Sequence, residues 1–108
     1  MIQAVQGTVE KIWLTLQEYD LTLIDQPAGY PKISIYDETE FLVNDAVMVE
    51  YEPGVCYYNF NVPSDKIGNY NTRFKFMFDG QERNVYDTLE IWSAEGAIEP
   101  KNYNVAGV

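Results

Sequence analysis

The chain has 108 residues, of which 46% are hydrophobic and 15% aromatic, and its 17 acidic and 7 basic residues give a net charge of −10. This length fits one domain, and the apolar content is too high for a disordered chain. No stretch is long and apolar enough for a transmembrane helix. Because nucleic acids and anionic membranes attract basic surfaces, the charge predicts no nucleic-acid and no membrane partner.

The residue inventory limits the chemistry further. The chain has no histidine and a single cysteine, Cys56. Ser-His and Cys-His catalysis, His-ligated zinc and thiolate metal clusters are therefore excluded. We expect a protein that is not an enzyme and needs no cofactor, with Cys56 as a buried, inert thiol in a reducing compartment. The opening MIQAVQGTVEK lacks the basic and apolar regions of a secretory signal, so we expect Met1 to be the true start.

Apolar and polar residues alternate with a period of two along most of the chain, which predicts β-strands. The alternation places Ile12 and Leu14 opposite Trp13, Phe60 on the core face of its strand, and Phe74 on the core face of the next. The expected strands are Val9–Gln17, a short piece at Leu21–Ile24, Lys32–Tyr36, Phe41–Val43, Ala46–Glu52, Val55–Val62, Tyr70–Phe78, Gln81–Val85 and a last strand ending near Trp92.

Turn signals separate these strands. Asp79-Gly80 between two strands predicts a two-residue type I′ hairpin, because both residues must adopt positive φ. Asn44-Asp45 and Pro53-Gly54 are expected to be turns. Tyr70 follows Gly68 at the start of a strand, which is typical of a tyrosine corner, in which the phenol binds nearby backbone; the alternative is an ordinary core tyrosine.

The spacing of strands and turns predicts an all-β fold: an antiparallel β-sandwich of about seven to eight strands. This domain is expected to span residues 1–92. Residues 93–108 contain Gly96, Pro100 and Gly107 and no sustained period, so they form a C-terminal arm or tail. The arm is either a frayed end or a segment that binds a partner.

Several stretches resemble immunoglobulin-like domains of the fibronectin type III and macroglobulin kind. They are GVCYYNF from Gly54, then Pro63, GNY at residues 68–70, FKF from Phe74, and Asp79-Gly80. The resemblance implies an Ig-like antiparallel β-sandwich with Greek-key topology. Among small examples, the chain resembles the Ig-like domains of tailed-phage virion proteins. The Cys–Trp–Cys set of antibody-type domains is missing, since Cys56 stands alone.

The resemblance implies a non-enzymatic structural component of a tailed-phage virion: a capsid decoration, neck, tail or baseplate accessory protein. Its partners would be virion structural proteins and itself, as a homo-oligomer, and it would be found in the virion after assembly in the host cytoplasm. The alternative is an Ig-like module that binds polysaccharide or a cell-surface ligand.

Candidate partner-contact residues come from three groups. Outward-facing tyrosines suit a protein interface or a sugar platform, or simply form cross-strand pairs. Basic residues on one face of a strand either pair with acids of the same sheet, such as Glu82, or bind an acidic neighbouring subunit. Apolar residues of the C-terminal arm could anchor the arm to a partner. The candidates are Tyr57, Tyr86, Arg73, Lys75, Ile98, Tyr103 and Val105.

The stretch from Asp37 to Glu52 contains six acidic residues and no basic one. Clustered carboxylates can bind Ca²⁺, although this spacing matches no EF-hand loop. The same charges could protect a sheet edge from aggregation or attract a basic partner. These three interpretations remain open at the level of sequence.

Overall fold

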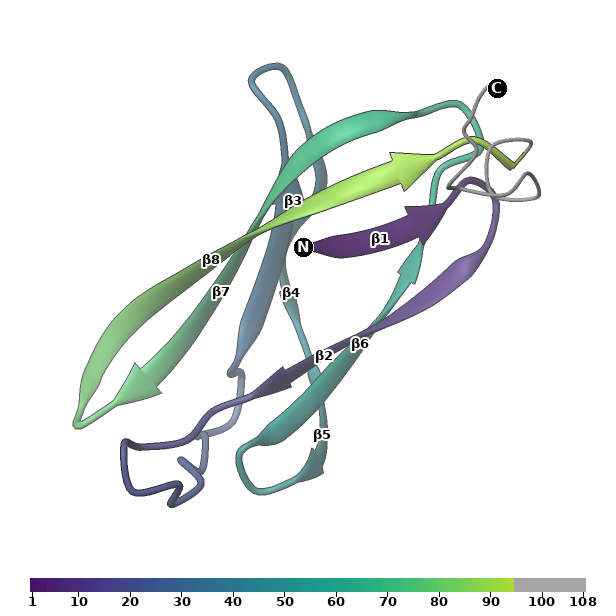
Figure 1. The fold of residues 1–108 in the computed structure, drawn as a ribbon. Coiled ribbons are helices and arrows are strands. Elements are labelled where there is room, and N and C mark those ends of the chain that lie inside the picture. Colours follow the sequence, from purple (N-terminus) through teal and green to yellow (C-terminus); the bar gives the residue numbers. More distant parts are fainter. Residues whose placement is uncertain (95–108) are drawn as a thin grey trace.

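A computed structural model describes residues 1–94, and it confirms an all-β sandwich of eight strands in two sheets (Figure 1). One sheet has the order β1-β8-β7-β3-β4 and the other the order β2-β6-β5. The strands are β1 (Ile2–Val5), β2 (Val9–Thr15), β3 (Lys32–Tyr36), β4 (Phe41–Val47), β5 (Val49–Glu52), β6 (Val55–Asn61), β7 (Gly68–Phe78) and β8 (Gln81–Trp92).

The strand order is that of an immunoglobulin-like Greek key. If β2, β3, β5, β6, β7 and β8 are taken as strands B, C, D, E, F and G, one sheet contains B, E and D and the other contains G, F and C. The short β1 was not predicted, and it departs from a purely antiparallel fold. It pairs in parallel with the last part of β8, with Ile2 opposite Leu89 and Val5 opposite Trp92.

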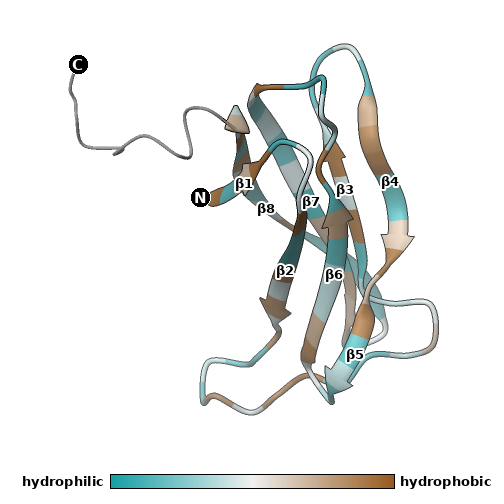
Figure 2. Ribbon diagram, turned by 90° about the vertical axis from the view of Figure 1, so that its right-hand side faces the viewer, coloured by the Kyte–Doolittle hydropathy of each residue, from teal (hydrophilic) through white to brown (hydrophobic). Residues whose placement is uncertain are grey.

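The core lies between the two sheets, and the predicted facing of the central strands is confirmed. Figure 2 shows apolar and polar residues alternating along the strands. Ile12, Phe60 and Phe74 are buried, whereas Trp13 is exposed. The buried cluster comprises Ala4, Ile12, Ile33, Ile35, Val43, Met48, Cys56, Phe60, Val62, Tyr70, Phe74, Leu89 and Ile91.

The chain crosses from one sheet to the other at Met48, and here the sequence-based boundaries are wrong. Asn44-Asp45 is not a turn, because β4 continues through it with an irregular register against β3 and a φ of +50° at Asp45. Met48 is buried between β4 and β5, and its N–H donates to the carbonyl of Pro31 at 2.9 Å. A single buried residue thus separates β4 of one sheet from β5 of the other.

The β7–β8 hairpin has the predicted turn. Asp79 and Gly80 have φ values of +54° and +72°, and Phe78 pairs with Gln81, as a type I′ turn requires. The strand after the turn is longer than predicted, since β8 runs unbroken from Gln81 to Trp92. Every residue from 81 to 88 is exposed, because this half of the hairpin extends beyond the other sheet (Figure 1).

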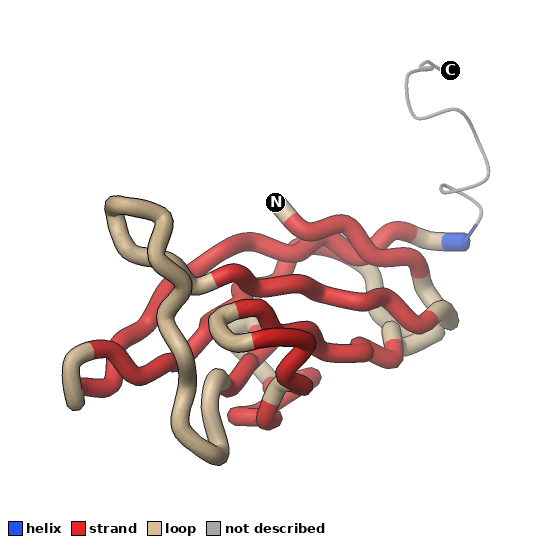
Figure 3. The backbone as a smooth tube through the Cα atoms, turned by 90° about the horizontal axis from the view of Figure 1, so that it is seen from below, coloured by secondary structure: helices blue, strands red, loops and turns tan. Residues whose placement is uncertain are grey.

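The predicted strand at Leu21–Ile24 is not formed. Figure 3 shows the long loop, in tan, that joins β2 to β3 at one end of the sandwich, and its only pairing is an isolated bridge between Gln17 and Leu23. The loop is held against the turn between β5 and β6. Leu16 N–H donates to the carbonyl of Gly54 at 2.7 Å, and Ile24 N–H donates to the carbonyl of Leu16 at 2.9 Å.

Tyr70 is a core tyrosine and not a tyrosine corner. The residue is only 6% exposed, but its hydroxyl makes no hydrogen bond within residues 1–94. Burial, followed by the negative charges of Asp37 and Glu40, raises the pKa of Tyr70 above its usual 10.0. Ionisation of this phenol is therefore less favourable in the folded chain than in the unfolded one.

We expect Tyr70→Phe to change the free energy of unfolding at pH 7 by less than about 1 kcal/mol, since no internal bond is lost. Because the pKa is raised on folding, wild-type stability should fall as the pH rises above the unfolded value of about 10. The variant should lose less stability over that range. Urea unfolding of both chains between pH 7 and pH 11 tests this. A loss of several kcal/mol at pH 7 would restore the tyrosine-corner interpretation.

Candidate functional site

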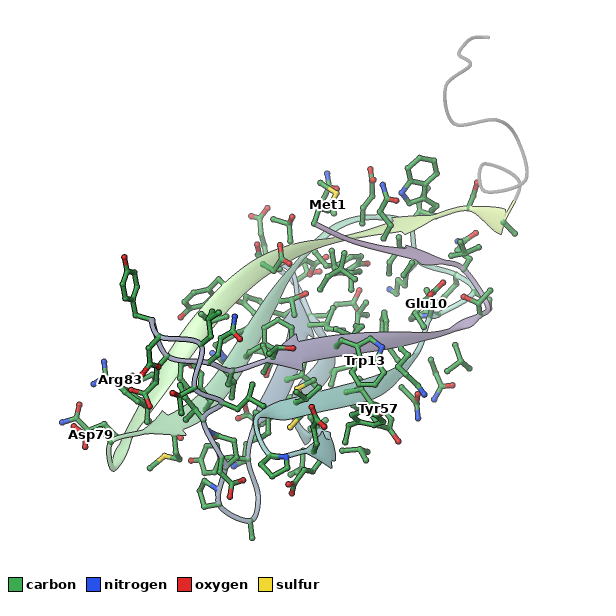
Figure 4. All side chains as sticks on the ribbon, turned by 60° about the horizontal axis from the view of Figure 1, so that its bottom comes forward. Met1, Glu10, Trp13, Tyr57, Asp79 and Arg83 are labelled. Carbon is green, nitrogen blue, oxygen red and sulfur yellow. The ribbon has the colours of Figure 1, made fainter. Side chains whose placement is uncertain are left out.

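An exposed aromatic cluster covers the outer face of the β2-β6-β5 sheet. The ladder places Trp13 of β2 opposite Tyr57 of β6, and Tyr57 opposite Val49 of β5. Trp13 is 48% exposed and Tyr51 is 66% exposed. Figure 4 shows Trp13 and Tyr57 side by side on neighbouring strands. We call the set of Lys11, Trp13, Val49, Tyr51 and Tyr57 the Trp13 surface.

The rings of the Trp13 surface contact one another at steep angles. The Tyr51 ring meets Trp13 edge-on, with centroids 5.4 Å apart and planes at 87°, and the Tyr57 ring is tilted by 52° at 5.2 Å. Lys11 Nζ lies 4.4 Å from the centroid of Tyr57 and 5.8 Å from that of Trp13. The result is a faceted apolar surface with one positive charge, in which neighbouring rings hold each other in place.

Of these residues, the sequence prediction included only Tyr57 as a contact residue. Trp13 had been assigned to the outer face of its strand, but nothing in the sequence showed that Tyr57 and Tyr51 would flank it. That depends on the register between β2, β6 and β5. The available signal was the outward position of Trp13. A tryptophan contributes most when its large apolar area is buried, so a tryptophan on a solvent-facing strand face indicates a contact surface.

Tyr86, Arg73 and Lys75 lie on the other sheet, away from the Trp13 surface. Tyr86 is 65% exposed and pairs with Arg73, which in turn pairs with Ser34. Arg73 Nη2 and Lys75 Nζ each lie 3.4 Å from the same Asp45 oxygen.

These ion pairs differ from the sequence prediction. Burial opposes ionisation of Asp45, but hydrogen bonds and charges, chiefly from Lys75, outweigh it and hold the pKa of Asp45 below its usual 3.8. Arg73 and Lys75 thus share the single carboxylate of Asp45, which balances one of their two positive charges. Glu82, the predicted partner, instead accepts a hydrogen bond from the Tyr30 hydroxyl. Arg83 lies on the opposite face of its sheet, because it pairs with Phe76, and its guanidinium lies over the Phe78 ring.

The acidic stretch does not gather into a metal site in the part of the chain that the structure describes. Asp37 Oδ1 instead accepts three hydrogen bonds from the turn that follows it, two from Thr39 and one from Glu40 N–H, at 2.8–2.9 Å. Glu40 pairs with Lys66 at 2.8 Å, and Asp45 pairs with bases of the sheet. Three of the carboxylates therefore have local structural partners.

Ile98, Tyr103 and Val105 lie outside the described residues, as does most of the predicted arm. Within residues 1–94, no helix is long and apolar enough to cross a membrane. Cys56 is buried, and that burial raises the pKa of its thiol, which disfavours the nucleophilic thiolate.

Comparison with known proteins shows a likeness of fold. No family model matches the chain, and no curated protein matches it. The solved structure of the endo-β-1,4-mannanase from Thermotoga petrophila is similar, with a TM-score of 0.53 and 10% identity. The similarity covers 86% of this chain and 18% of the mannanase chain, so this chain spans less than a fifth of that protein's length.

Proposed function

We propose that this chain is a non-enzymatic structural component of a tailed-phage virion, and that it docks on other virion proteins through the Trp13 surface. The observation that carries the proposal is the exposed Trp13 between Tyr51 and Tyr57. Tryptophan and tyrosine are the residues most enriched at the centres of protein interfaces, where they bury much area at little cost in conformational entropy.

The ring geometry favours a protein over a polysaccharide as the partner. Stacking on a sugar chain requires ring faces that are open and aligned, but Tyr51 stands at 87° to Trp13. Lys11 covers a face of Tyr57. An uneven apolar surface with one cation instead complements side chains of a folded partner.

The chemistry of the chain supports a structural role. The chain has no histidine, and its one thiol is buried, so the usual nucleophile and base pairs are absent. The phage setting rests on the resemblance of the Gly54–Gly80 motifs to Ig-like virion domains. Placement in a virion, with assembly in the host cytoplasm, is part of the same proposal.

Truncation of Trp13 should weaken docking without unfolding the chain. We expect Trp13→Ala to lower binding to virion particles by about 30-fold, as for an interface hot spot worth about 2 kcal/mol. The chain should stay folded, although its thermal midpoint should fall somewhat, because Trp13 is half exposed but packs against Tyr51 and Tyr57. Co-sedimentation of each variant with particles that lack the wild-type chain, over a range of concentrations, measures the effect.

Tyr86→Ala provides the matched control, since it removes an exposed aromatic ring from the other sheet. We expect it to bind particles as the wild type does. Loss of binding in Tyr86→Ala, with Trp13→Ala unaffected, would move the docking site to the five-stranded sheet. If the wild type binds soluble polysaccharide and Trp13→Ala does not, the polysaccharide-binding alternative would instead be supported.

A further inference from the structure

The first half of β8 presents an open sheet edge. β1 covers β8 only from Leu89 to Trp92, so Met1 stands opposite Thr88, where its ammonium group lies 3.5 Å from Asp87 Oδ1. No strand within residues 1–94 pairs with the free side of residues 81–87. The open edge is therefore seven residues long, from the hairpin turn to the start of β1.

The hairpin decides which backbone groups point to this edge. In a two-residue hairpin the flanking pair, here Phe78 and Gln81, is hydrogen-bonded, and bonded and non-bonded pairs then alternate. Residues 82, 84 and 86 of β8 consequently point their N–H and C=O groups away from β7. Thr88 fits this alternation, since its N–H binds Asp87 Oδ1 at 2.7 Å and not β7.

The opposite side of the same hairpin shows how the chain covers such groups elsewhere. Met77, which pairs with Glu82, points its backbone groups beyond the end of β3. Its N–H donates to Gln26 Oε1 at 2.8 Å, and Gln26 Nε2 donates to its carbonyl at 2.9 Å. Within residues 1–94 the backbone groups of Glu82, Asn84 and Tyr86 have no equivalent cover.

The inward-facing side chains of this segment are also exposed to solvent. Val85 pairs with the buried Phe74 and therefore faces inward, yet it is 43% exposed. Arg83 and Asp87 face the same way and are exposed as well. A partner strand at the open edge would extend the five-stranded sheet and cover part of Val85.

We propose that a second copy of this chain occupies the edge, pairing β8 with β8 in antiparallel fashion around a two-fold axis at Asn84. Directly opposed residues of two neighbouring strands point their side chains to the same face of the sheet, and successive residues of one strand alternate between faces. When two copies of the same strand pair, the opposed residue numbers must therefore be both odd or both even. A centre at Asn84 uses residues 81–87 and stops before Met1. Bulges interrupt β4 and β5, but β8 pairs with β7 without one.

The side chains are compatible with this register. Glu82 of one copy lies opposite Tyr86 of the other, and Arg83 lies opposite Val85. Arg83 has two diagonal neighbours in the second copy, Asp87 and the symmetry-related Arg83, so one opposite-charge pair and one like-charge pair lie within reach of a long side chain. No two acidic residues are directly opposed, although each copy carries a net charge of −10.

Hydrogen exchange followed by NMR tests the proposal on the full chain, from micromolar to millimolar concentration. We expect the amides of Glu82, Asn84 and Tyr86 to become protected as the concentration rises, in step with a dimer seen by sedimentation. The amides of residues 83 and 85, which bond to β7, should be protected throughout. Protection of the edge amides that does not depend on concentration would overturn the proposal, because the chain's own residues would then cover the edge. A monomer at every concentration would overturn it too.

Two sets of variants make the test specific. Asn84→Pro removes the N–H at the two-fold axis while sparing the bonds to β7, and proline is tolerated at such edge positions. We expect it to abolish the dimer, whereas the matched Asn84→Ala keeps it. Equal dimerisation of these two variants would exclude this edge.

The charge pair provides an independent check. Arg83→Asp should weaken dimerisation about tenfold, because it places acids diagonally across both halves of the interface. Adding Asp87→Arg should restore the dimer. Trp13→Ala should leave the dimer intact, and loss of the dimer in that variant would place self-association on the Trp13 surface and overturn the β8 pairing.

Discussion

Phe74→Ala should lower the free energy of unfolding by about 3–5 kcal/mol, the usual cost of truncating a buried phenylalanine. Phe74 is 4% exposed and lies mid-strand in β7, paired with Ile33 of β3 and Val85 of β8. The lost ring leaves a cavity that two flanking strands keep from collapsing. Since a small domain has only about 5–15 kcal/mol of stability, this change would consume a large part of it.

Asn71→Ala is the matched control for Phe74→Ala. Asn71 is exposed on the outer face of the same strand, so its truncation should cost less than about 0.5 kcal/mol. Urea unfolding monitored by tryptophan fluorescence compares the two. A similar midpoint shift for both variants would show that β7 is not anchored in the core as described.

Gly54→Ala should be the second most damaging substitution, costing about 3 kcal/mol from backbone strain and overpacking together. Gly54 has a φ of +82°, which disfavours any residue with a Cβ. An added Cβ would lie 2.8 Å from Leu23 Cβ and 3.1 Å from both Ile24 N and the Leu16 carbonyl oxygen. Ile24 N–H donates to the Leu16 carbonyl, and Leu16 N–H donates to the Gly54 carbonyl, so these backbone atoms cannot move independently of the turn.

Gly80→Ala separates the two parts of that cost. Gly80 has a similar φ of +72°, but an added Cβ would meet nothing within 4 Å. Its substitution should therefore cost only the conformational part, about 1–2 kcal/mol. Thermal or urea unfolding of both variants measures the difference. Equal losses would show that the contact with the β2–β3 loop contributes nothing.

The sequence predicted the longer strands whose two faces differ in polarity and missed the short β1. β2, β6 and β7 each have one buried and one wetter face, so a period of two reveals them. β1 has only four residues, and its partner lies at the other end of the chain. Its parallel pairing needs no hairpin turn, and turns are the strongest local signal of pairing.

The crossing at Met48 was hidden for a different reason. Val47 and Val49 are apolar but exposed, and Met48 between them is the buried residue. The alternation over Ala46–Glu52 therefore does not mark a core face, because the chain changes sheets at this point and the pattern belongs to two strands. Burial here depends on tertiary position, which short-range periodicity does not encode.

The candidate site shows the same limit. The sequence placed Trp13 and Tyr57 on outer faces, but their contact depends on register, which a single strand does not reveal. Arg73 and Lys75 were grouped correctly on one face. Their common partner, Asp45, comes from β4, whose backbone is irregular at that residue.

The parallel pairing of β1 with β8 determines how the domain would respond to force. Because the two strands run in the same direction, the N-terminus and the end of β8 lie at opposite ends of the β1–β8 ladder. Tension applied between them would pull the strands past each other, loading the ladder's hydrogen bonds together, whereas an antiparallel hairpin pulled at its two ends opens one bond at a time. The evenly spaced bonds of a parallel pair share such a load. A four-residue strand thus becomes the mechanical clamp of the fold.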